Sequence, residues 1–272
     1  MSTARGLPIH FLPVSVLYVY AVTRDPVTPD AEAVDGSRRF DSVTIDHIAA
    51  VFTPVDAETF SQEVIDQRAN DLEWLGAIGY RHQAVVSELM KHTAIVPLRA
   101  FTMFSSAEAL RTYLHDNAEL LQKTLDRLDG KQEWTLRLEI DAQRWSEALV
   151  GRVPSLRTLQ DDIATAPSGK AFLLRKKLDE AKKRASREAE GSLVAEVEEE
   201  VVRRLACEAI AESRERRGGA FPQINMLINR DEEPALQALR DEMLTRYEPE
   251  GVVLALSGPW PPYSFASTET HG

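Results

Sequence analysis

The sequence predicts an α+β fold with two domains, each a small, mostly antiparallel sheet packed with helices. Short runs of β-branched and aromatic residues recur in both halves of the 272-residue chain, and segments with helical spacing lie between them. A turn at Asp129-Gly130 separates the halves. We therefore expect domains at residues 1–130 and 131–256 and a tail at 257–272. A ferredoxin-like, split β-α-β arrangement is the simplest candidate for each domain.

The first half begins with a strand pattern and continues with helices. Residues 14–22 are apolar on both faces, which is typical of a central strand. Helical spacing extends from Phe60 to Leu89, and Ser105-Ser-Ala-Glu108 has the form of a capping box that opens a second helix. The other expected elements are a loop at 25–42, a strand at 43–53, a short strand at 95–98 and a helix end at 129–130. Pro97 makes the short strand either an edge strand or the end of a strand.

The second half alternates strands and helices. Apolar and polar residues alternate from Trp134 to Ile140, which predicts a strand with one wet face. A charged helical stretch covers 170–217, and Gly191-Ser192 offers a natural break and a new N-cap. The other expected elements are a loop that holds Pro154 and Pro167, a strand at 221–228, a helix at 232–247 and a strand at 252–256.

Composition limits the possible partners. The net charge of −11 disfavours nucleic acid and anionic membrane surfaces, because both repel an acidic protein. Cys207 is the only cysteine, which excludes an internal disulfide framework and an all-cysteine metal cage, and its helical setting indicates a buried, inert thiol. Residues 7–22 favour a strand over a signal-peptide helix, and nowhere do ~18 apolar residues follow one another. We expect a cytoplasmic protein.

Motifs that carry chemistry are absent from the sequence. It holds neither a Gly-x-Ser-x-Gly elbow nor a His-Glu-x-x-His pair, and Gly169-Lys170 lacks the upstream glycine and the following Ser or Thr of a phosphate loop. The six histidines are scattered, and His82 lies on an apolar helix face, as expected of a core histidine with a satisfied hydrogen bond. Asp161-Asp162 and the run 198–200 read as solvated carboxylates. We expect no cofactor, no metal and no catalytic residue.

Basic clusters at 175–177, 182–184 and 214–217 are interleaved with Asp and Glu. Pairing of residues four apart on a helix is expected to account for most of these charges. No aromatic residues alternate with them, as a base-stacking platform requires. The clusters therefore predict a solvated helix face rather than a nucleic-acid site.

The C-terminal tail has an unusual composition, Gly258-Pro-Trp-Pro-Pro-Tyr-Ser-Phe265. Three prolines predict an extended, polyproline-like path. Trp260, Tyr263 and Phe265 are large apolar groups, and burial of each would contribute roughly 2 kcal/mol. Two readings stay open: the tail clasps the protein's own second domain or the interface between domains, or it docks on a partner.

The tail resembles the C-terminal signature of the gas vesicle accessory proteins of the F/L type. Where that family usually has Phe-Gly after an arginine, this chain has Ala100-Phe101 after Arg99, which puts the tight glycine turn in question. The other segments that resemble the family's motifs are Leu17-Tyr-Val-Tyr20, Trp74-Leu75, Arg81-His82, Val85-Val86, Val96-Pro-Leu-Arg99 with Thr102 and Phe104, Glu133-Trp134, and Ser168-Gly-Lys-Ala-Phe-Leu-Leu-Arg-Lys177.

This resemblance implies a non-enzymatic accessory or minor structural protein of gas vesicles, the protein-shelled, gas-filled compartments that give buoyancy. Its implied partners are the hydrophobic shell protein and other accessory proteins, and its implied location is the cytoplasm, in association with gas vesicles. The alternative is a small-molecule-binding regulatory protein with ferredoxin-like domains. The residues expected to bind a partner or to brace the tail are Trp260, Tyr263, Phe265, Arg99 and Phe101.

Overall fold

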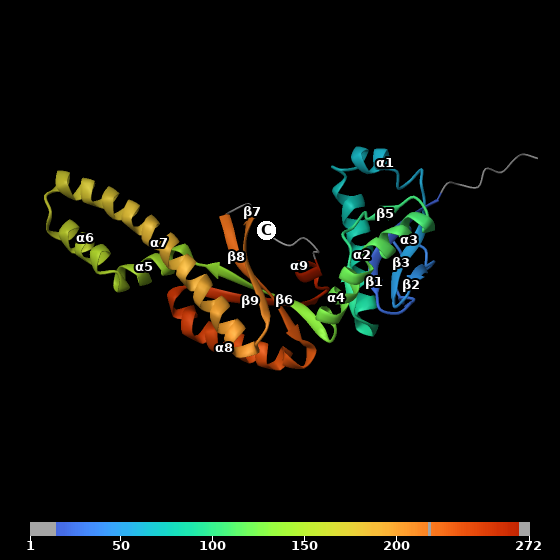
Figure 1. Ribbon diagram of the computed structural model, residues 1–272. Coiled ribbons are helices and arrows are strands. Elements are labelled where there is room, and N and C mark those ends of the chain that lie inside the picture. Colours follow the sequence, from blue (N-terminus) through green and yellow to red (C-terminus); the bar gives the residue numbers. More distant parts are fainter. Residues whose placement is uncertain (1–14, 217–218, 267–272) are drawn as a thin grey trace, which may run out of the picture. The chain divides into compact units, whose positions relative to one another are not determined.

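A computed structural model describes residues 15–216 and 219–266 (Figure 1). The chain forms two compact units. One comprises Met1–Gly130 together with Pro261–Gly272, and the other comprises Lys131–Trp260. Each unit holds one antiparallel sheet packed with helices, so the predicted α+β class is confirmed. Parts of three expected elements lie outside the described residues: residue 14 of the first strand, Arg217 of the charged helical stretch and residues 267–272 of the tail.

The sheet of the first unit has its most buried strand in the middle. Its strands are β1 (Ser15–Thr23), β2 (Asp41–Ile45), β3 (Ile48–Asp56), β4 (Ile95–Pro97) and β5 (Met103–Phe104). Their order is β2-β3-β1-β4, with β5 also paired to β1, and all pairs are antiparallel. Residues 18–22 of β1 are fully buried, as the apolar pattern on both faces predicts. The single strand expected at 43–53 is wrong: Asp46, at φ 48°, turns the chain between β2 and β3.

The helices of the first unit are shorter than their periodicity indicates. They are α1 (Gln62–Gln67), α2 (Leu72–His92), α3 (Ala107–Asp116), α4 (Ala118–Leu128) and α9 (Tyr263–Ala266). The helix expected from Phe60 to Leu89 is divided, because the Asp71 carboxylate caps a new start at the Trp74 amide, 3.0 Å away. The expected capping box is also wrong. Ser106 caps α3, and Glu108 pairs instead with Arg111 at 2.8 Å.

The second unit runs strand, helices, strand, strand, helix, strand. Its sheet has the order β7-β8-β6-β9, and neighbouring strands are antiparallel. Leu136 and Leu138 on β6 contribute to a core that the helices cover on one face. The elements are β6 (Lys131–Ile140), α5 (Ala142–Arg152), α6 (Pro154–Thr165), α7 (Ser168–Leu205), β7 (Glu208–Arg216), β8 (Gly219–Asn229), α8 (Glu233–Tyr247) and β9 (Val252–Trp260), with 3-10 turns at Arg230–Glu232 and Glu248–Glu250.

Two expectations for this unit are wrong. The loop expected around Pro154 is helical, because the Asp141 carboxylate caps α5 and Pro154 occupies the first turn of α6, where no amide hydrogen is needed. The break expected at Gly191 is absent, because the buried leucine and valine stripe of α7 continues to Leu205. The helix ends at Ala206, which has φ 46°, and the next residues pair with β8 as β7 instead of extending the helix.

Cys207 follows this helix end and is half-buried rather than on a helix. Burial raises the pKa of its thiol to about 11. The thiol is therefore protonated near neutral pH, in line with the expectation of an inert cysteine.

Candidate functional site

The proline-rich tail is not an extended arm. Gly258, Pro259 and Trp260 form the end of β9, where Trp260 lies opposite Glu133 of β6. The Trp260 side chain is 43% exposed, and its indole nitrogen donates to Ser257 Oγ at 3.4 Å. The chain then passes through Pro261 and Pro262 into the single turn α9. The prolines thus join a strand of the second unit to a helical turn of the first.

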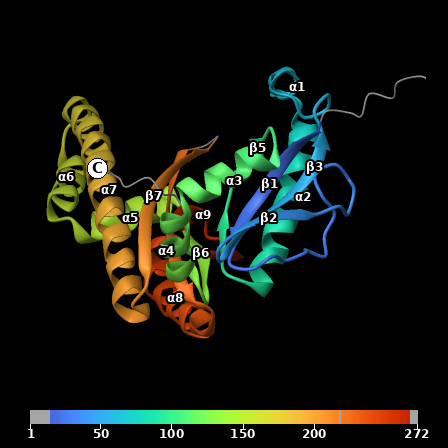
Figure 2. The ribbon, with the colours of Figure 1, turned by 45° about the vertical axis from the view of Figure 1, so that its right-hand side comes forward.

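The turn α9 belongs to the core of the first unit. Figures 1 and 2 show it beside α4, and it also contacts β4. Phe265 is 3% exposed, and the Arg127 guanidinium of α4 donates to its carbonyl oxygen. The reading that the tail clasps the second domain is therefore wrong for Tyr263 and Phe265, which pack in the first unit.

A buried histidine connects the tail to this core. His82 of α2 is 3% exposed, and its Nε2 lies 3.1 Å from both the Leu98 carbonyl oxygen and the Tyr263 hydroxyl. Its Nδ1 lies 3.1 Å from the Tyr18 hydroxyl. Since a carbonyl oxygen can only accept, the proton resides on Nε2, and Nδ1 accepts from Tyr18. His82 is thus a core histidine with both nitrogens satisfied, as its place on the apolar face indicates.

Burial keeps every ionisable group of this cluster neutral. It lowers the pKa of His82 to about 4, because the charged imidazolium would lose its hydration. It raises the pKa values of Tyr18 and Tyr263 for the same reason, because the phenolate is the charged form. A histidine that stays neutral and whose two nitrogens are both engaged is a structural group here, not a proton shuttle.

Phe101 adopts a backbone conformation that glycine tolerates most readily. Its φ of 66° lies in the left-handed region, which is strained for an aromatic residue. Two contacts hold it there: its amide donates to the Tyr18 hydroxyl at 3.0 Å, and its ring lies 5.5 Å from the Trp74 ring, centroid to centroid. The tight turn is therefore kept without glycine. Arg99 in the same turn has an exposed side chain, and its carbonyl accepts from the Thr102 hydroxyl at 2.7 Å.

The five residues singled out from the sequence thus do not form one site. Phe101 and Tyr263 meet around Tyr18 and His82, whereas Phe265 is buried in α9, where its carbonyl oxygen accepts from Arg127. Trp260 and Arg99 are exposed. Sequence reasoning missed Tyr18 as the link between Phe101 and His82. A polar hydroxyl within a strand that is otherwise apolar on both faces was the available signal, because such a group needs a buried hydrogen-bond partner.

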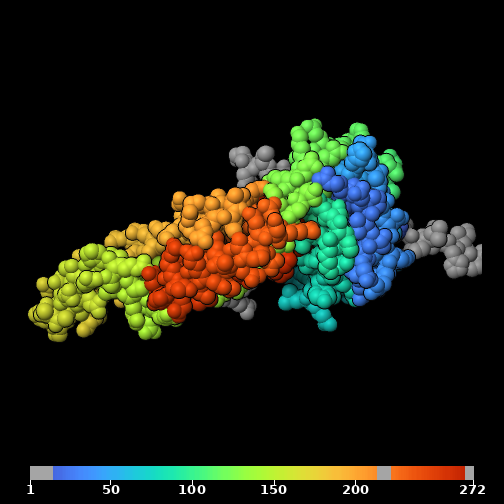
Figure 3. All heavy atoms as spheres, turned by 90° about the horizontal axis from the view of Figure 1, so that it is seen from below, coloured from blue at the N-terminus to red at the C-terminus, as the bar shows by residue number. Residues whose placement is uncertain are grey.

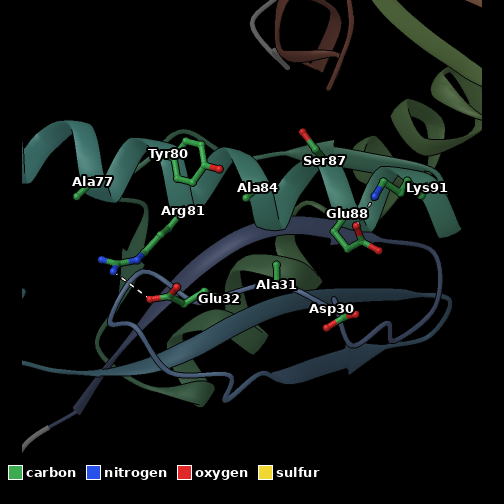
Figure 4. A pocket seen from close by; sticks show the side chains of 10 residues that line it. All are labelled: Asp30, Ala31, Glu32, Ala77, Tyr80, Arg81, Ala84, Ser87, Glu88 and Lys91. Atoms are coloured by element: carbon green, nitrogen blue, oxygen red, sulfur yellow. Dashed lines mark hydrogen bonds and ion pairs between the residues drawn. The ribbon is translucent and has the colours of Figure 1, made fainter.

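A separate open groove lies in the first unit between α2 and residues 30–32 (Figure 4). Its volume is about 640 Å³, its lining includes Ala77 and Ala84 of α2 and Ala31 on the facing segment, and Tyr80 on its wall is 78% exposed. Its two basic groups are already paired: Arg81 lies 2.9 Å from Glu32, and Lys91 lies 2.5 Å from Glu88. These pairs leave the groove without an uncompensated basic charge.

Within 15–216 and 219–266, no group of three or more His, Cys, Asp or Glu side chains is arranged to hold a metal ion. None of the described helices combines the length and apolar character that a membrane span requires.

The fold and most of the chain match known proteins. The family model described as gas vesicle synthesis protein GvpL/GvpF matches residues 16–267. The chain belongs to this family. Gas vesicle protein L of Streptomyces sp. is 28% identical over 259 residues, with 92% of each chain covered, and gas vesicle protein L2 of Halobacterium salinarum is 28% identical over 263 residues, with 92% of this chain and 90% of the relative covered.

Two crystal structures share the fold. GvpF from Anabaena sp. PCC7120 aligns with a TM-score of 0.67 at 17% identity, and the alignment covers 95% of this chain and 98% of that one. GvpF from Microcystis aeruginosa aligns with a TM-score of 0.64 at 16% identity, covering 93% and 99%. At these identities the structural likeness establishes the fold, whereas the family model establishes the membership.

Proposed function

We propose that this GvpL/GvpF family member is a non-enzymatic accessory or minor structural protein that binds the hydrophobic gas vesicle shell protein and supports vesicle assembly. The observation that carries the proposal is the family match across residues 16–267. The buried state of His82 is consistent with it, because both ring nitrogens of this histidine are engaged in hydrogen bonds within the core. The proposed location is the cytoplasm, at gas vesicles and among other accessory proteins of the assembly.

The physical task fits such a protein. A shell subunit that presents an apolar face to gas must be shielded from water before it is assembled. An exposed sheet edge can bind an extended segment by adding a strand. β9 is an edge strand of the second sheet, and it exposes Val253 (46%) and Trp260 (43%). This edge could hold a shell segment while its side chains contact apolar residues of that segment.

Under this proposal the buried tail residues stabilise the fold, and the exposed ones contact a partner. Tyr263 and Phe265 brace the first unit, and Trp260 and Arg99 are available to a partner. Phe101 shapes the turn that carries Arg99. We also assign the second unit to the ferredoxin-like topology, which its β7-β8-β6-β9 order supports, since the helices fall after the first and third strands in the chain.

Co-expression of the tagged full chain with the shell subunit tests the proposal. We expect the shell subunit to be retained with wild-type protein and reduced several-fold with Trp260→Ser. Leu72→Ser is the matched control, because Leu72 is also apolar and exposed (82%) but lies outside the proposed contacts. If wild-type protein retains no shell subunit, shell binding is wrong. If Trp260→Ser retains as much shell subunit as the wild type does, β9 is not the edge that binds it.

A small-molecule-binding regulator is the second candidate, because the groove of Figure 4 has a volume within the range of ligand pockets. A ligand that binds only the folded state raises the melting temperature with its concentration. Thermal-shift screening of the wild type and of Ala84→Trp, whose ring would occupy the groove from the α2 side, distinguishes the two functions. A ligand that raises the melting temperature of the wild type but not of Ala84→Trp would support the small-molecule-binding regulator.

A further inference from the structure

The N-terminal half of α7 carries an apolar pair that no other part of its unit covers. Phe172 is 68% exposed and Leu173 is 66% exposed, whereas Ala171 and Leu178 are buried. α6 and α7 pack against each other as a hairpin, which Figures 1 and 2 show extending beyond the sheet of the second unit. In Figure 3 the green and yellow atoms of this hairpin project past those of α8. The pair thus lies on the side of α7 that no packed helix uses.

Basic charge is concentrated on the same half of the helix. Residues 168–187 hold eight lysines and arginines and two carboxylates, a net charge of +6 in a chain whose total is −11. Within the described chain, no carboxylate lies within 4.0 Å of any of these eight side chains. The expectation that helical pairing neutralises the clusters at 175–177 and 182–184 is therefore wrong.

The C-terminal half of α7 behaves differently. Arg203 lies 2.7 Å from Glu200, and Arg204 lies 3.2 Å from Glu242 on α8. Both basic residues of 188–205 thus have carboxylate partners within the unit, whereas those of 168–187 have none. The contrast marks the N-terminal half as a charged surface without an internal partner.

The unpaired charges follow the apolar pair along the helix. Residues four, seven and eleven positions apart share a helix face, so Phe172, Lys176 and Lys183 form one row and Leu173, Lys177 and Arg184 form the next. From Phe172 to Arg184 this face spans about 18 Å, the length of a helix of about 12 residues. It therefore presents an apolar contact at one end and cations along the rest.

We propose that this α7 face, formed by Phe172, Leu173, Lys176, Lys177, Lys183 and Arg184, binds an acidic amphipathic helix of another protein. Apolar residues of that helix pack on Phe172 and Leu173, and its carboxylates pair with the basic rows. The inference does not depend on shell binding, because it rests on exposure and charge alone.

Charge favours an acidic protein over the other anionic partners. Outside 168–187 the chain has a net charge of −17, which repels the extended charge of a membrane or nucleic acid more than that of one short helix. A nucleic-acid platform would also need several stacking aromatic residues, and 168–187 contains only Phe172.

Fluorescence anisotropy of the full chain with a labelled 18-residue Leu/Glu amphipathic peptide tests the proposal. A Leu/Lys peptide of the same pattern and a scrambled Leu/Glu peptide are the controls. We expect micromolar affinity for the Leu/Glu helix, at least tenfold weaker binding of both controls, and at least tenfold weakening between 50 and 300 mM NaCl.

Two variants of the face should each weaken binding at least tenfold: Phe172→Ser with Leu173→Ser, and Lys176→Glu with Lys183→Glu. The matched controls lie in the first unit and should bind as wild type: Leu72→Ser for exposed apolar area, and Arg38→Glu with Arg111→Glu for exposed charge. Because the altered side chains are exposed, far-ultraviolet circular dichroism should show no loss of helix.

Four outcomes would overturn the proposal. They are absence of peptide binding, binding that the face variants leave unchanged, tighter binding to phosphatidylglycerol vesicles or to a 20-nucleotide single-stranded DNA, and self-association that the face variants abolish. The last would identify a second copy of the chain as the occupant.

Discussion

Replacing Phe265 with alanine tests whether the C-terminal turn is part of the core of the first unit. The ring is 3% exposed, and a buried Phe→Ala change lowers the free energy of unfolding by about 3–5 kcal/mol. Because the two units need not unfold together, a single melting curve would mix their stabilities. Hydrogen exchange measured by mass spectrometry separates them, since it follows the amides of each element.

In Phe265→Ala we expect the amides of β1 and α2 to exchange roughly 100-fold faster or more, because each 1.36 kcal/mol corresponds to a factor of ten. The amides of β6 and β8 should be unchanged. Leu254→Ala, at a residue of β9 that is 1% exposed, is the matched control and should give the reverse pattern. Wild-type exchange of β1 and α2 in Phe265→Ala would refute the assignment of α9 to that core.

Three further changes test local features. Gly258→Ala should destabilise the second unit by about 2 kcal/mol or more, measured by hydrogen exchange of the β6 amides, since φ is 147° and a Cβ would lie 2.7 Å from the Trp134 ring. Gly191→Ala, with nothing within 4 Å of its Cβ, should stabilise α7 by up to about 1 kcal/mol in the same measurement, and equal effects of the two changes would contradict this. Phe101→Gly should leave the first unit about 1 kcal/mol more stable than Phe101→Ala does, measured by hydrogen exchange of the β1 amides, because only the glycine relieves the φ of 66°. The reverse order would argue against strain. The free energy of unfolding of the first unit should fall by up to about 3 kcal/mol between pH 6.5 and about 4, because the unfolded state binds a proton at His82 that the buried imidazole, with its pKa of about 4, does not. His82→Gln should remove this pH dependence, measured by hydrogen exchange of the β1 amides at each pH, and an unchanged slope would exclude the histidine as its cause.

Regular patterns in the sequence predicted the elements whose packing follows the pattern. The alternation from Trp134 to Ile140 marks β6, because one face of that strand meets the helices and the other does not. The apolar face of α2 likewise placed His82 in the core. In both elements the residues that the periodicity places on one face are the residues that are buried, so the periodicity predicts the burial.

The errors occurred where long-range contacts outweigh local preference. Gly191 is unfavourable within a helix. The leucines and valines after it are buried against the second sheet, however, and their packing keeps α7 helical through Gly191. Residues 208–216 are as charged as the preceding helix, but pairing with β8 makes them a strand. For the candidate site, sequence alone could not place Tyr263 beside His82, because 181 residues separate them.

The passage of the chain out of the first unit at Gly130 and back into it at Pro261 affects the order of folding. During synthesis, all of Lys131–Trp260 is made before Tyr263 and Phe265 exist. The second unit can therefore complete its core while the first still lacks the turn that fills the space beside His82 and α4. Domains usually complete folding in the order of their synthesis, N-terminal first. In this protein the unit that begins the chain is the last to be finished.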